Sequence, residues 1–172
     1  LLEEFGWTKA ATSAAFSVYL VLYGILGIFV GRLNDRFGPR LVLTACACFL
    51  GLGYALMSRI GAIWHLYVAY GVLIAVGMSG IWVPLISTIP RWFIRRRGLM
   101  TGIVTSGSGI GTILLSIAAS ALIAEYQWRM SYLIVGGGVW MILTLSAQFL
   151  RRDPRQMGQE PYGGDVVKTA AV

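Results

Sequence analysis

The sequence predicts an all-α fold, a polytopic transmembrane bundle with five spanning helices, and three observations support that prediction. Hydrophobic residues make up 57% of the 172 positions and charged residues only 12%, which differs strongly from soluble globular domains. Five long apolar runs contain no Asp, Glu, Lys, Arg or His. The basic residues stand between those runs rather than within them.

The lengths of the runs suit helices. A helix that crosses a bilayer core of about 30 Å needs roughly 20 apolar residues, because each residue adds about 1.5 Å. The runs are continuous rather than alternating, and they are too long for the strands of a transmembrane barrel. We therefore expect spanning helices near Ala11–Val30, Leu41–Ser58, Leu66–Ile89, Leu99–Ile123 and Met130–Leu150.

The net charge of +7 does not indicate a nucleic-acid-binding surface, because most of the 14 basic residues form three short clusters between runs. Short loops rich in Lys and Arg remain on the cytoplasmic side of a membrane. The clusters follow the first, third and fifth runs, so we expect them inside and the amino terminus outside. They comprise Arg32, Arg36 and Arg40, then Arg91, Arg95, Arg96 and Arg97, and then Arg151, Arg152 and Arg155. The alternate segments hold Lys9, Arg59 and Arg129.

An amino terminus outside the cell needs a signal peptide or a preceding helix. The chain opens on Leu1-Leu2-Glu3-Glu4, which lacks the basic region and apolar core of a signal peptide. We therefore expect one more helix upstream. Residues 1–152 would then be the amino-terminal half of a longer helix bundle without its first helix. Residues 153–172 combine Pro, Gly and charged residues, which is typical of the start of a polar linker, although a natural tail fits equally well.

The residues that carry enzyme or metal chemistry are scarce. Cys46 and Cys48 lie two apart in a predicted helix and therefore point to nearly opposite faces, so they neither bridge nor form a metal site. His65 stands beside Trp64 at the outer end of the third run, which favours an interfacial position over a proton relay. We expect no catalytic residue, no metal and no cofactor, and an integral membrane enzyme is disfavoured.

Glycines recur at helical neighbour spacing within the runs. Small residues at i and i+4 let membrane helices pack closely, and the same smooth faces suit helices that slide during a conformational cycle. The sequence does not separate these two roles. The glycines in question are Gly24, Gly27 and Gly31 in the first run, and Gly98, Gly102, Gly107 and Gly111 in the fourth.

The most specific motif is the first predicted cytoplasmic loop, Gly31–Arg40, which reads G-R-L-N-D-R-F-G-P-R. Asp35 is the only acid in the two inner loops that join helices, and Arg32, Arg36 and Arg40 surround it. A carboxylate there can pair with an arginine or lie at the positive amino end of a helix in one conformation only, which would make a latch. The alternative is a solvated loop with weak surface ion pairs.

The motif resembles the signature loop between the second and third helices of the major facilitator superfamily. Further features are most similar to the branch of monocarboxylate and oxalate/formate carriers, and the resemblance covers most of Gly6–Gly163. Pro39 departs from the pattern, because many members have a basic residue there. The further features are Pro84, Arg91-Trp92-Phe93, Arg97-Gly98, Gly102, Gly107, Gly111, Trp128-Arg129 and Arg151-Arg152-Asp153-Pro154.

The resemblance implies helices two to six of a twelve-helix transporter in the plasma membrane, with the solute path between two six-helix halves. It implies that Asp35 and Arg36 lock the outward-facing state against the other half, that Gly31 and Gly38 permit close approach and a tight loop, and that Arg40 completes the motif. It also points to a small organic anion as solute, moved by secondary active transport. Other solutes (sugar, drug or amino acid) and a receptor or channel are the alternatives.

The predicted spans contain no ionisable group, so the cationic partner of an anion would come from outside this sequence. Neutral polar and aromatic residues near mid-membrane depth are then the candidates for lining a cavity, with helix packing as the alternative role. They are Tyr19 and Tyr23 in the first run, Ser79 and Trp82 in the third, and Thr105, Ser106 and Ser108 in the fourth.

Overall fold

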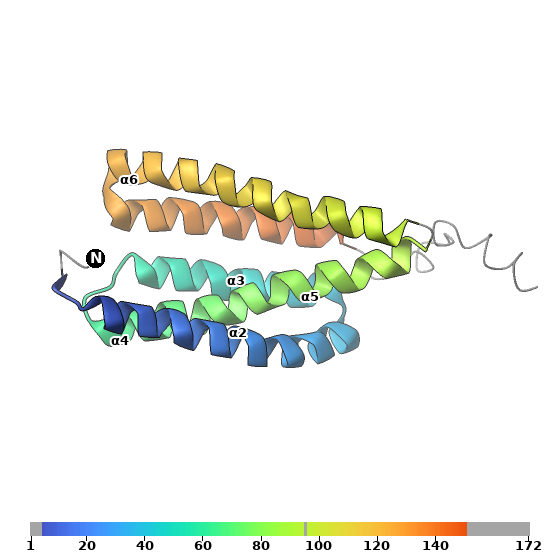
Figure 1. Ribbon diagram of the computed structural model, residues 1–172, viewed down its shortest axis with the longest axis horizontal. Coiled ribbons are helices and arrows are strands. Elements are labelled where there is room, and N and C mark those ends of the chain that lie inside the picture. The colour runs from blue at the N-terminus through green and yellow to red at the C-terminus, as the bar shows by residue number, and fades with distance from the viewer. Residues whose placement is uncertain (1–4, 95, 151–172) are drawn as a thin grey trace, which may run out of the picture.

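The computed structural model describes residues 5–94 and 96–150, together with their side chains except that of Arg91. Its described part is helical and contains no strand, which confirms the all-α prediction (Figure 1). The helices are α2 (Lys9–Phe37), α3 (Pro39–Met57), α4 (Ile63–Leu66), the π-helix η1 (Tyr67–Ile74), α5 (Ala75–Trp92) and α6 (Arg97–Phe149). Four helical stretches are long and apolar enough to cross a membrane, namely α2, α3, Ile63–Pro90 and α6.

Helix α6 is two antiparallel arms rather than one rod. A straight helix of its 53 residues would be about 80 Å long, more than twice the thickness of a bilayer core. Gln127 interrupts it with a non-helical φ of 64° and ψ of 160°, and the chain folds back beside itself (Figure 1). The arms, residues 97–126 and 128–149, contain the fourth and fifth predicted runs. The Ser131 hydroxyl donates to the Gln127 carbonyl over 2.7 Å and holds the turn.

Two predicted boundaries need correction. The segment Gly31–Arg40 is not a loop, because α2 continues through Phe37 and α3 begins at Pro39, so that Gly38 alone connects them. The third predicted run begins earlier, at Ile63, and it includes eight π-helical residues that periodicity did not reveal. The tyrosine hydroxyl of Tyr67, the first of these residues, donates to the Ala11 carbonyl of α2 over 2.9 Å.

The described arginines of the first two clusters lie at one end of the bundle, which we call the basic end. The end of α2, the start of α3, the end of α5 and both termini of α6 lie there (Figure 1). The outlying basic residues Lys9, Arg59 and Arg129 lie at the opposite end, near the start of α2 and the two turns. The third predicted cluster, Arg151, Arg152 and Arg155, and the predicted linker 153–172 fall outside the described residues, as does Arg95.

Helix α3 forms the centre of the bundle, and glycines of its neighbours let it approach closely. A Cβ added at Gly77 of α5 would lie 2.7 Å from the Cβ of Leu50 and 2.9 Å from its Cα. A Cβ at Gly80 of α5 would collide with Cys46, and one at Gly136 of α6 with Tyr54. Because lipid gives helices no hydrophobic reason to associate, such close contacts stabilise the bundle.

These are not the glycines that the spacing singled out. An added Cβ at Gly24, Gly27, Gly98, Gly102, Gly107 or Gly111 would meet nothing within 4 Å in the described part of the chain. The last four lie on the first arm of α6, where Ile113, Leu114 and Ile117 are 63, 62 and 65% exposed. Spacing alone does not say whether a glycine faces a neighbouring helix, so the packing role predicted for these glycines finds no partner within the described chain.

The close contact at Gly77 leads to a stability prediction. Gly77→Ala should destabilise the protein by about 1–3 kcal/mol, because the methyl group would press on the backbone of Leu50 rather than on a movable side-chain tip. Gly61→Ala is the control, since an added Cβ at Gly61 meets nothing within 4 Å. The measurement is the Tm of the detergent-purified protein, and equal Tm values for both variants would contradict the packing role.

Candidate functional site

The signature segment is a one-residue turn whose geometry demands glycine. Gly38 has φ of 83° and ψ of 162°, a conformation that side chains with a Cβ rarely adopt. Its N–H donates to the Asn34 carbonyl over 3.0 Å, which closes α2, and Pro39 then starts α3 with the fixed φ that a first helical turn needs. The turn therefore holds the ends of α2 and α3 in a fixed relation.

Asp35 is exposed in the last turn of α2. The carboxyl end of a helix carries partial negative charge, so a carboxylate there costs the helix about 0.3–1 kcal/mol, whereas Arg36 beside it is favourable. The position of Asp35 therefore does not stabilise α2. A carboxylate kept at an unfavourable helix end is suited to a partner outside that helix.

The arginines of the signature segment differ in their surroundings. The Arg40 guanidinium donates to the side-chain oxygen of Gln148 over 2.8 Å and so joins the start of α3 to the end of α6. The Arg36 guanidinium carbon lies 5.4 Å from the centre of the Phe37 ring, and Arg32 is exposed. The structure therefore places Asp35, Arg36, Gly38 and Arg40 together at the basic end, as their sequence proximity predicts.

Gly31 differs from Gly38 in its surroundings. An added Cβ would lie 3.8 Å from Val83 of α5, which is ordinary van der Waals contact. Helix α2 and α5 therefore do not need a glycine at this position to pack together. The role in close helix approach that the resemblance implies for Gly31 stays a prediction about parts of the protein beyond the described residues.

The predicted cavity residues are divided among three environments. Tyr19 and Tyr23 of α2 are stacked with ring centres 5.9 Å apart, and Tyr19 also contacts Tyr70 of η1 at 5.3 Å. Ser79 is only 2% exposed, and Trp82 is partly buried. Thr105, Ser106 and Ser108 lie on the exposed first arm of α6. The structure thus does not bring these residues to one pocket.

The hydroxyl protons of the serines and threonines are mostly engaged. Ser79 donates to the Val76 carbonyl, Ser106 to the Ile103 carbonyl, and Thr105 to the Thr101 carbonyl over 2.9 Å. A hydroxyl that donates to its own helix offers lone pairs to a ligand but no proton. Among the predicted residues, the phenols of Tyr19 and Tyr23 and the indole N–H of Trp82 are therefore the groups best able to donate to an anion.

A cavity of about 370 Å³ lies between α3 and both arms of α6, and sequence reasoning missed it. Its wall combines apolar side chains with hydroxyl groups. The spacing of Thr112 and Ser116, one helical turn apart, was a signal for a shared face, but nothing in the sequence showed that α3 would lie opposite. The hydroxyl-bearing lining residues are Tyr54, Thr112, Ser116, Ser131 and Tyr132.

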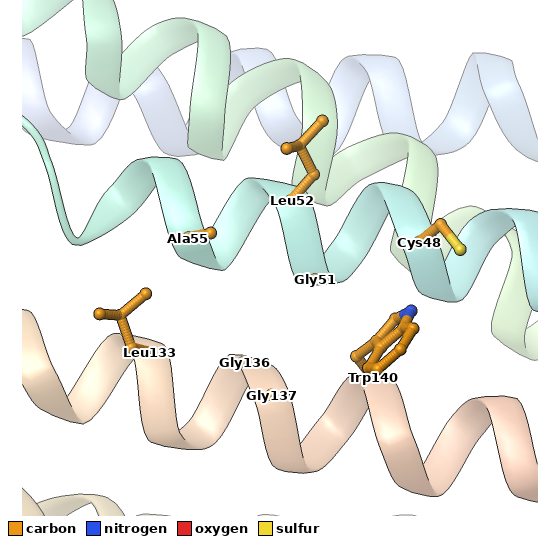
Figure 2. A pocket seen from close by; sticks show the side chains of 8 residues that line it. All are labelled: Cys48, Gly51, Leu52, Ala55, Leu133, Gly136, Gly137 and Trp140. Atoms are coloured by element: carbon orange, nitrogen blue, oxygen red, sulfur yellow. The ribbon is translucent and has the colours of Figure 1, made fainter.

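A second cavity, of about 400 Å³, lies on the side of α3 that faces the second arm of α6. Figure 2 shows Leu52 and Cys48 on α3, and the indole of Trp140 reaching from α6 toward Cys48. Gly51, Ala55, Gly136 and Gly137 provide the space, because they lack large side chains. The lining contains no charged side chain and no hydroxyl group, so this cavity does not suit a polar solute.

His65 and the cysteines have structural surroundings. The His65 Nδ1 accepts a hydrogen bond from the Ala62 N–H over 3.2 Å, so the imidazole caps the start of α4. Its ring centre lies 4.0 Å from that of Trp64, and the two rings are tilted by 36°. Cys46 is buried and Cys48 is exposed, as their spacing predicts. Within residues 5–94 and 96–150, no three His, Cys, Asp or Glu side chains are grouped to hold a metal ion.

Comparisons with known proteins agree with the signature segment. The family model described as Major Facilitator Superfamily matches residues 1–170. Human "Monocarboxylate transporter 14" is 29% identical over 93% of this chain and 31% of its own length. Mouse "Monocarboxylate transporter 12" is 40% identical over 55% of this chain and 20% of its own length. The "Fujikurins efflux protein" of Gibberella fujikuroi is 28% identical over 84% of this chain and 32% of its own length. The chain spans about a third of the length of these relatives, or less.

The turn at Gly38 gives a direct stability prediction. Gly38→Ala should lower the stability by about 1–3 kcal/mol, because it forces a Cβ into a strained backbone conformation. Gly31→Ala is a matched change within the same motif, and its Cβ would make only ordinary contact with Val83. Thermal unfolding of the two purified variants tests this, and a Gly38→Ala protein as stable as Gly31→Ala would refute the strained turn.

Proposed function

Because this chain belongs to the major facilitator superfamily and resembles its monocarboxylate transporters, we propose that the full-length protein moves a small organic anion across the plasma membrane by alternating access. The observation that carries the proposal is the family match over residues 1–170, together with a signature turn at the basic end of a bundle whose predicted spans lack Asp, Glu, Lys, Arg and His. In this proposal the basic end faces the cytoplasm. The described helices belong to the amino-terminal half, and a preceding helix and a second six-helix half complete the carrier.

The substrate class follows from the names of two relatives and from the chemistry of the chain. Human and mouse relatives are named monocarboxylate transporters, and the predicted solute-facing residues here are aromatic and neutral polar. An apolar wall with phenol donors suits a small carboxylate with an apolar body. The predicted spans contain no Lys, Arg or His, so we place the cation that pairs with the carboxylate in the preceding helix or in the second half.

The efflux relative supports a second candidate. Because the "Fujikurins efflux protein" matches 84% of this chain, export of a larger organic compound is the alternative function. Reconstitution of the full-length protein in liposomes separates the two. We expect uptake of a radiolabelled short-chain monocarboxylate that unlabelled monocarboxylates inhibit. Absence of such uptake by a correctly folded protein would refute the proposed substrate class.

The latch role of Asp35 is testable by transport kinetics. Asp35→Asn keeps the shape of the side chain but removes the charge, and a charge-assisted hydrogen bond contributes about 1.5–3 kcal/mol, so we expect about a tenfold or greater loss of maximal rate. The KM should change little, because Asp35 lies at the end of the bundle. Glu125→Gln, at the opposite end, is the control. Normal maximal rates for Asp35→Asn would argue against the latch.

A substitution of Tyr23 tests whether the predicted cavity residues contact the solute. Tyr23→Phe removes one phenol donor while keeping the ring, and a hydrogen bond contributes about 0.5–1.5 kcal/mol net, so the KM should rise roughly 2- to 10-fold. The exposed Tyr126 near the turn at Gln127 provides the control variant Tyr126→Phe. If both variants transport with the KM of the unaltered protein, Tyr23 does not contact the solute.

A further inference from the structure

A buried polar contact joins α2 to α5 one residue before the signature carboxylate. Asn34 is only 4% exposed, although it lies three residues from the end of α2. Its side-chain Nδ2 donates to the Ser87 hydroxyl of α5 over 3.1 Å. This hydrogen bond between side chains joins α2 directly to α5. Sequence reasoning passed over Asn34 because it sits among the charged residues of the motif.

The contact reaches a weak point of α5. The Ser87 hydroxyl donates to the Pro84 carbonyl over 3.2 Å, so the amide of Asn34, Ser87 and Pro84 form a continuous chain of hydrogen bonds. Pro84 and Pro90 both lie inside α5 and lack an N–H, so the helix loses backbone hydrogen bonds on either side of Ser87. Asn34 therefore bonds to the turn of α5 in which the helix backbone makes the fewest hydrogen bonds of its own.

The amide of Asn34 is only half satisfied by the described residues. Its Oδ1 is buried and has no hydrogen-bond partner among them. Rotating the amide by half a turn would let Oδ1 accept from Ser87, but Nδ2 would then be buried without an acceptor. A buried polar group without a partner destabilises the folded protein, so Asn34 is not the residue that packing alone would favour at this position. An apolar side chain would pack there at lower cost.

We propose that Asn34 is a positioning residue for the transport cycle, which fixes the rotation of the end of α2 and thereby the direction of the Asp35 carboxylate. Successive residues of a helix point about 100° apart, so docking Asn34 on α5 turns Asp35 outward. Asp35 is indeed exposed while Asn34 is buried. Single buried polar residues set register in helical assemblies at a cost in stability, which is the behaviour expected here. This inference rests on the proposed transport function.

Transport kinetics of the full-length protein provide the first test. Asn34→Leu should lower the maximal rate about tenfold with a KM within about twofold, as expected for a residue that acts on the cycle rather than on binding. The Tm should stay equal or rise, because a buried polar group is replaced by an apolar one. A purely structural residue would instead lower the Tm.

The partner residue supplies the matched variants. Ser87→Ala should reproduce the kinetic defect, and the double variant Asn34→Leu with Ser87→Ala should be no slower than either single variant, because the two residues act through one contact. The exchanged pair, Asn34→Ser with Ser87→Asn, should regain rate. Thr88→Ala is the control, since its hydroxyl also donates to the Pro84 carbonyl, over 2.6 Å, and so bonds within α5. Additive defects, or an equal defect in Thr88→Ala, would overturn the proposal.

A measurement of the distance between α2 and α5 tests the positioning role of Asn34 independently of the proposed transport function. Spin labels at Phe37→Cys and Ile86→Cys, both exposed positions, report the spacing of α2 and α5 in a background with Cys46 and Cys48 replaced by alanine. Asn34→Leu should broaden the distance distribution, while Thr88→Ala should not. An unchanged distribution would overturn the positioning role even if the protein transports. Failure of the unaltered protein to transport would overturn the proposed function and leave the distance result standing.

Discussion

The close approach of α3 to its neighbours is the contact on which the remaining architecture depends. In lipid, apolar side chains gain nothing by leaving one apolar environment for another, so helices associate where backbones fit tightly. Gly77 and Gly80 bring α5 against Leu50 and Cys46, and Gly136 brings the second arm of α6 against Tyr54. The signature turn, the two cavities between α3 and α6 and the contact of Arg40 with Gln148 all depend on this packing.

The helices could be predicted from the sequence, but the contacts between them could not. Charge-free runs of about bilayer length identify helices reliably, because lipid leaves the backbone few alternatives. The connections between helices were harder to predict. The charged residues around Asp35 indicated a loop, whereas α2 continues through them to Phe37. Spacing identified the glycines that lie one helical turn apart. Which of them faces a neighbouring helix depends on how each helix is rotated about its own axis, and the spacing does not show that rotation. Gly53 and Gly77 had no distinguishing local pattern, although both press against a neighbouring helix.

In the candidate site too, contacts between residues close in sequence could be predicted, and contacts between residues far apart in sequence could not. The signature residues Asp35, Arg36, Gly38 and Arg40 are close in sequence, so their proximity at the basic end was predictable. The cavity between α3 and α6 joins Tyr54 to Ser116 and Tyr132, residues far apart along the chain, and no pattern connects them. The sequence also did not show which hydroxyl groups are free to donate to a ligand. The structure shows that Thr105 and Ser106 donate their hydroxyl protons to helix carbonyls. Among the predicted cavity residues, the phenols of Tyr19 and Tyr23 and the indole of Trp82 therefore remain the groups best able to donate.

The single-residue turns at Gly38 and Gln127 also bear on how the chain enters a bilayer. Adjacent helices with no slack between them cannot be inserted far apart in time or tilted independently, so α2 with α3, and the two arms of α6, behave as paired hairpins during biogenesis. Epitopes or protease sites placed in either turn would have to unwind helix ends to become accessible. The stretch between Met57 and Ile63 is the longest described connection between helices away from the basic end, so it has the most room for a reporter.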